Sequence, residues 1–89
     1  MSYHPATMHL MYESRSFVVV GWTQTEQDAV LAFELVDKPA GEQVFLVRDA
    51  AQAFRAQCKA WEERTPDKAE VDATVRAYMQ LGRLPLVTH

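Results

Sequence analysis

The sequence predicts an α+β domain in which a four-stranded antiparallel meander is followed by two α-helices, in the order β-β-β-β-α-α. Three observations lead to this fold class. Four short apolar runs, two of them rich in β-branched residues, occupy the first half of the chain. The segments between them are too short for parallel crossovers. From residue 49 onward, apolar residues recur every three or four positions, which is the helical period.

The first two strands are predicted from apolar runs at residues 9–12 and 17–22, which flank the polar segment 13–16. Two such runs around a short polar break indicate a hairpin. We expect residues 1–7 to be a flexible N-terminal tail, since Pro5 disfavours regular structure and chain ends commonly fray. Residues 8–89 then form a single α+β domain.

The next two strands are predicted at residues 29–36 and 43–47. The polar stretch 23–28 is interpreted as a loop. Pro39 and Gly41 indicate a turn between the third and fourth strands, because proline presets one turn angle and glycine allows positive φ.

The first helix is predicted to begin at Asp49, a good N-cap residue, and to end before Pro66. Its apolar stripe consists of Ala51, Phe54, Cys58 and Trp61. We expect both helices to pack on one face of the sheet.

The second helix is predicted to begin after Asp67, because Asp67 and Glu70 have the spacing of a capping box. Gly82 is interpreted as its C-cap. The apolar face of this helix consists of Val71, Val75, Tyr78 and Met79.

Charge and composition exclude several function classes. The chain of 89 residues has 9 basic and 12 acidic residues, a net charge of −3, and no run of Lys or Arg. These features argue against nucleic-acid binding and against a polybasic membrane anchor. No apolar run is long enough to span a bilayer and no secretory signal is present, so we expect a cytoplasmic protein.

The middle strands have apolar residues on both faces, which is unusual for a sheet with helices on one side only. Val18, Val20 and Trp22 share one face of the second strand. On the third strand, Val30, Ala32, Glu34 and Val36 share a face. Two helices cover one face of the sheet, so three coverings are open for the other: a second copy in a C2 dimer, the chain termini, or a different protein.

The leading functional hypothesis is therefore a small non-enzymatic interaction module that forms a homodimer. Its expected interface consists of Val18, Val20, Trp22, Val30, Glu34 and Val36. Trp22 is the expected anchor, because tryptophan is enriched among energetically dominant interface residues. The alternative is a small-molecule-binding or enzymatic domain, in which Glu34 is the polar group of a ligand site on this face or at the sheet–helix seam.

The sequence assigns no catalytic, metal or cofactor residues. His4, His9 and His89 lack the spacing of a zinc site and no cysteine pair accompanies them. Cys58 lies on the apolar stripe and is interpreted as a small core residue that makes no disulfide within the chain. The chain has neither a phosphate-binding loop nor a dinucleotide fingerprint, so no cofactor is expected.

The segments 33–38 (FELVDK) and 43–46 (QVFL) resemble a family of small bacterial proteins, mostly proteobacterial, known only as a domain of unknown function. The resemblance extends from residues 8–12 through 18–20, 54–55, 66 and 70–72 to Pro85 and His89. Gln43 departs from the family pattern, in which a glutamate is expected. The resemblance implies a free-standing bacterial cytoplasmic domain, and it implies no activity or site residues.

Overall fold

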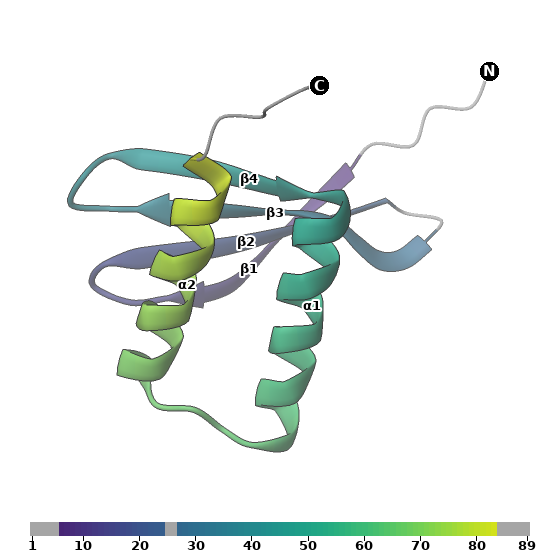
Figure 1. Cartoon of the computed structure of the whole chain (residues 1–89). Helices are drawn as coiled ribbons and strands as arrows, with labels where there is room; N and C mark the ends of the chain where they lie inside the picture. Colours follow the sequence, from purple (N-terminus) through teal and green to yellow (C-terminus); the bar gives the residue numbers. More distant parts are fainter. Residues whose placement is uncertain (1–5, 25–26, 84–89) are drawn as a thin grey trace.

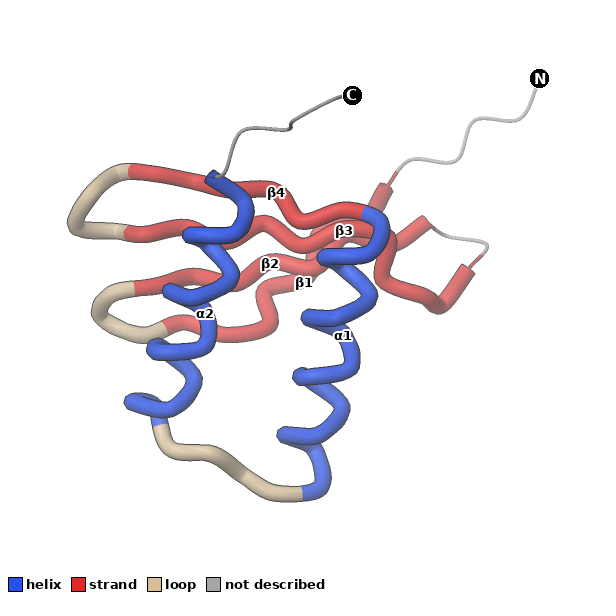
Figure 2. The backbone as a smooth tube through the Cα atoms, viewed as in Figure 1, coloured by secondary structure: helices blue, strands red, loops and turns tan. Residues whose placement is uncertain are grey.

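The computed structural model describes residues 6–24 and 27–83 and contains the predicted meander and helix pair (Figures 1 and 2). The strands are hydrogen-bonded in the order β1-β2-β3-β4, with every neighbouring pair antiparallel. Figure 1 shows both helices on the same face of the sheet. The elements are β1 (Ala6–Glu13), β2 (Phe17–Gln24), β3 (Gln27–Asp37), β4 (Glu42–Val47), α1 (Arg48–Glu63) and α2 (Lys68–Arg83).

Two predicted boundaries are displaced, because strand pairing uses the backbone and tolerates polar side chains. β2 continues to Gln24 and β3 begins at Gln27, so most of the predicted loop at 23–28 belongs to strands. Bulges on either side of Thr23 accommodate this irregular end of the β2–β3 pair. β1 begins at Ala6, within the predicted tail; residues 1–5, 25–26 and 84–89 lie outside the described residues.

The turn between β3 and β4 forms as predicted. Gly41 has a φ of +67° and donates its N–H to the carbonyl of Asp37 at 2.9 Å. The side chain of Lys38 then ties this turn to the first hairpin. Its Nζ lies 2.6 Å from the carboxylate of Glu13 and donates to the carbonyl of Ser14 at 2.8 Å.

The start of α1 differs from the prediction. No side chain caps this helix: its N-cap is Val47, the last residue of β4, and Asp49 lies inside the first turn. Arg48, the first residue of α1, adopts a φ of +54°. The chain therefore reverses within one residue, which leaves no place for a separate capping residue.

The start of α2 follows half of the predicted capping box. Asp67 Oδ1 accepts the backbone N–H of Glu70 at 2.8 Å, so Asp67 is the cap. The Glu70 side chain pairs with Arg64 at 2.6 Å and holds the end of α1 near the start of α2. Gly82 is not a C-cap, because α2 continues to Arg83.

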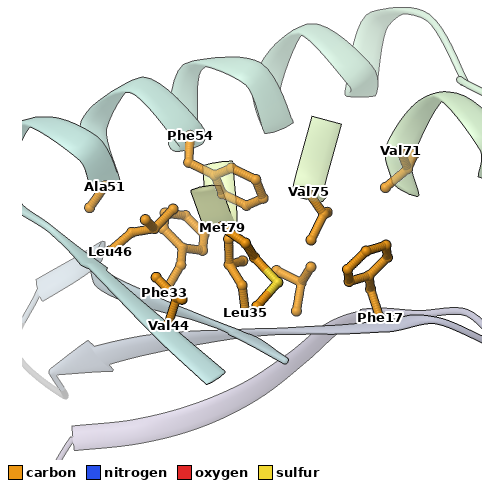
Figure 3. Close-up of a cluster of buried hydrophobic side chains, with 11 residues drawn as sticks. Phe17, Phe33, Leu35, Val44, Leu46, Ala51, Phe54, Val71, Val75 and Met79 are labelled. Carbon is orange, nitrogen blue, oxygen red and sulfur yellow. The ribbon is translucent and has the colours of Figure 1, made fainter. Parts of the chain in front are cut away.

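The core lies between the sheet and the two helices (Figure 3). Phe54 of α1 is fully buried, with its ring edge-on to Phe33 at 4.8 Å and to Tyr78 at 5.0 Å between centroids. The two helices make their closest backbone approach to β3 and β4. The core residues are Phe17, Val19, Phe33, Leu35, Val44, Leu46, Ala51, Phe54, Val71, Val75 and Met79.

Within the described residues, neither helix is long and apolar enough to cross a membrane.

Candidate interaction surface

The outer face of the sheet, defined here as the face opposite the helices, is built by strand register. Residues paired across antiparallel strands share a face. Phe17, Val19, Phe33 and Leu35 point into the core, so their alternating neighbours point outward. The outer face has three cross-strand rows: Glu13–Val18–Val36–Gln43, Leu10–Val20–Glu34–Phe45 and Met8–Trp22–Ala32–Val47.

Nine of these twelve positions are apolar, and the polar ones are Glu13, Glu34 and Gln43. A sheet with one solvated face normally alternates apolar and polar residues. No lysine or arginine occupies the three rows, although such residues commonly protect exposed sheets from association. This composition is typical of a sheet face that is covered by another protein surface.

The expected interface residues that the structure describes all lie on this outer face. Val18, Trp22 and Val36 are half-buried and Val20 is buried among its neighbours. The Nε1 of Trp22 is buried and has no hydrogen-bond partner in the described chain. Val30 lies in β3 opposite Thr23, and its side chain is outside the described part of the structure.

The most exposed apolar residues of the outer face were not among the predicted interface residues. Leu10 is 64% exposed and Met8 60% on β1, while Phe45 is 53% and Val47 52% on β4. They lie on the two edge strands, whereas the predicted interface consists only of residues on the central strands. The alternation in Gln43–Val47, with Val44 and Leu46 buried, is the signal that could have found half of them.

Glu34 lies near the middle of the outer face, between Val20 and Phe45 in its row. Its side chain is half-buried and makes no hydrogen bond or ion pair with the rest of the described chain. Because it points away from the helices, it is not a polar group of the sheet–helix seam.

The histidines do not form a site in the described residues. His9 shares a hydrogen bond of 3.0 Å with Thr23 Oγ1, while His4 and His89 lie outside the described ranges. Over residues 6–24 and 27–83, no three side chains among His, Cys, Asp and Glu come together as metal ligands.

The thiol of Cys58 is half-buried beside the core. Burial first, and the negative charge of Glu62 second, raise the pKa of this thiol from its ordinary value of 9.0 to about 11. Both factors disfavour the thiolate, which is the nucleophilic form. Cys58 is therefore poorly suited to act as a nucleophile at neutral pH.

This pKa gives a testable expectation for thiol chemistry. At pH 7.5, alkylation of native Cys58 by iodoacetamide should be about 100-fold slower than in the urea-unfolded chain, since a shift of two pKa units removes that fraction of thiolate. The rate should keep rising with pH up to about 11. The measurement is the mass-spectrometric time course of labelling from pH 7 to 10.5; equal rates in native and unfolded protein would contradict the raised pKa.

A contact cluster joins the first hairpin to α2. Asp72 Oδ1 accepts hydrogen bonds from Tyr12 OH and from Ser14 Oγ, both at 2.8 Å. Ser14 Oγ in turn accepts the backbone N–H of Phe17 at 3.2 Å. Burial, followed by this bond to Asp72, raises the pKa of Tyr12. Tyr12, Ser14 and Asp72 are all engaged in structural hydrogen bonds, so the cluster orients the helix over the hairpin.

Comparison with known protein families confirms the family resemblance, because one family model matches the chain. The family model described as "Protein of unknown function (DUF3567)" matches residues 8–89. No curated protein and no solved structure matches the chain. With this match covering nearly its whole length, the chain belongs to the DUF3567 family of proteins of unknown function.

Proposed function

We propose that this protein is a small interaction module that forms a homodimer through the outer face of its sheet. The observation that carries the proposal is the composition of that face, with nine apolar positions in twelve and four exposed apolar side chains at its edges. Two such faces stacked at the usual sheet–sheet distance of about 10 Å would give a four-layer helix–sheet–sheet–helix assembly.

The size of the face fits a dimer that dissociates on dilution. One position on a sheet face occupies about 33 Å², from the strand spacing and the two-residue rise, so twelve positions cover about 400 Å² of sheet plane. Because the side chains protrude from the sheet, the accessible surface area of the face is larger than this planar area. A standard interface buries about 800 Å² per partner. The area that each outer face could bury therefore approaches that of the smallest specific interfaces.

A second copy is favoured over an unrelated partner because the face is self-complementary in character. The face is largely apolar, so two copies related by a C2 axis would bury apolar surface against apolar surface. Glu34 is its one central charge, and no basic side chain on the face compensates it. Its desolvation opposes association, which also favours a reversible dimer.

The test is light scattering on a sizing column across a dilution series. The proposal expects a mass approaching twice the 10.1 kDa of the chain at high concentration, falling towards 10.1 kDa on dilution. Phe45→Ser and Leu10→Ser should each raise the dimer Kd at least tenfold, because both side chains are exposed and apolar. Leu81→Ser is the matched control, since Leu81 is 58% exposed but lies on α2.

Glu34→Gln is a variant that should change the dimer Kd in the opposite direction to Phe45→Ser and Leu10→Ser. Removing the central charge should lower the dimer Kd, because less desolvation opposes association. A chain that is monomeric at every concentration, or a dimer that Leu81→Ser weakens as much as Phe45→Ser, would refute the proposal.

A further inference from the structure

A cavity of about 460 Å³ opens on the helix side of the sheet, at the seam between the β1 edge and the helix pair. It arises because the helices approach β3 and β4 most closely, which leaves the β1 side to be filled by side chains. A bulge between Leu10 and Tyr12 also brings Met11 to this seam. The volume lies within the range of small-molecule sites.

The walls of the cavity are mainly apolar and aromatic. Tyr12, Phe54 and Trp61 line it, together with the sulfur-containing side chains of Met11 and Cys58. The aromatic rings also contact other residues: Phe54 is edge-on to Trp61 at 6.4 Å between centroids, and Tyr12 donates a hydrogen bond to Asp72. The site is therefore formed before any ligand arrives.

Among the described residues that line the cavity, Glu62 is the one with a charged side chain. The side chain of Glu62 makes no hydrogen bond or ion pair with another described residue. Its charge acts at the cavity, because it contributes, after burial, to the raised pKa of the Cys58 thiol. Within residues 6–24 and 27–83, no lysine or arginine lines the cavity to balance that charge.

We infer that this cavity binds a small organic cation, an amine or quaternary ammonium carried on an apolar or aromatic body. Aromatic faces attract cations through their quadrupole and accept apolar groups by burial. Glu62 supplies the opposite charge at the rim. This inference does not depend on the proposed dimer, because the cavity and the outer face lie on opposite sides of the sheet.

The inference is tested with three probes that share one body and differ in charge: 4-phenylbutylammonium, 4-phenylbutanol and 4-phenylbutyrate. The full-length ¹⁵N-labelled chain is titrated with each at pH 7, and the two indole N–H signals are followed by NMR. We expect the ammonium to bind at least tenfold more tightly than the carboxylate, with the alcohol between them. The Trp61 signal should shift and the Trp22 signal should not.

Two glutamates adjacent in sequence provide a matched pair of variants. Glu62→Gln should reduce the preference for the ammonium over the carboxylate by at least fivefold. Glu63→Gln makes the same change in net charge at an exposed residue outside the cavity lining, and should leave the preference unchanged. Equal affinity for all three probes, equal effects of the two variants, or shifts confined to Trp22 would overturn the inference.

Discussion

Asp72→Ala is expected to lower the free energy of unfolding by about 3–4 kcal/mol. Two hydrogen bonds to a charged group are lost, each contributes about 1.5–3 kcal/mol, and the half-buried position of Asp72 places both near the low end of that range. Asp72 Oδ1 accepts from Tyr12 OH and Ser14 Oγ at 2.8 Å, and the substitution leaves both hydroxyls without that acceptor. For a chain of this length the total stability is about 5–13 kcal/mol, so the loss is a large share. Urea unfolding at low, equal protein concentrations measures it.

Three variants separate the hydrogen bonds from other effects of the substitution. Asp72→Asn keeps an acceptor oxygen and should cost less than half as much as Asp72→Ala. Tyr12→Phe should cost about 1–2 kcal/mol alone and much less in the Asp72→Ala background. Asp49→Ala, an exposed carboxylate in the first turn of α1, is the control and should change stability by under about 1 kcal/mol. Equal losses for Asp72→Ala and Asp49→Ala would rule out the cluster as a source of stability.

The sequence predicted the features of this fold that depend on near neighbours. The antiparallel meander was predicted as the simplest arrangement of four strands with short connections, although short connections alone leave the strand order open; the structure has the order β1-β2-β3-β4. The helix faces followed from the 3.6-residue period: Phe54, Val75 and Met79 are all buried as expected. The turn at Gly41 and the cap at Asp67 each depend on a residue's own conformational chemistry.

The features that sequence reasoning missed depend on contacts between distant segments. Tyr12 and Asp72 are 60 positions apart, and nothing in the local pattern of either residue indicates their bond. The N-cap of α1 is Val47, two residues before the predicted Asp49, because Arg48 adopts a positive φ that its side chain does not favour.

The candidate surfaces were likewise only partly predictable. Alternation within the central strands placed Val18, Val20, Trp22, Glu34 and Val36 on one face, and the register confirms that they share it. The edge residues Leu10 and Phe45 join that face through pairing with β2 and β3, which the sequence does not specify. The cavity at Glu62 depends on where the helices lie over the sheet.

Gly82→Ala is expected to destabilise the protein by about 1–2 kcal/mol, although alanine is favoured over glycine in a helix by about 1 kcal/mol. Gly82 was predicted as a C-cap, but it lies within α2, where a Cβ would overlap Cγ1 of Val44 on β4. Val44 is buried, so its side chain has little room to move away. The glycine therefore allows the end of α2 to approach the sheet, and urea unfolding of the two proteins measures the difference.

The decisive form of this experiment is a double-mutant cycle with Val44→Ala. The other two Val44 atoms near the added Cβ are the valine's own Cβ at 3.4 Å and Cγ2 at 3.7 Å; alanine removes Cγ2 and retains only the Cβ, at an ordinary contact distance. Val44→Ala alone should cost about 2 kcal/mol through lost burial. In that background the overlap is absent, so Gly82→Ala should raise stability by up to about 1 kcal/mol, in line with helix propensity. The sign of the Gly82 effect thus depends on Val44, with a coupling of about 2–3 kcal/mol. A Gly82→Ala effect of the same sign and size in both backgrounds would show that glycine is not required there for close packing of α2 on β4.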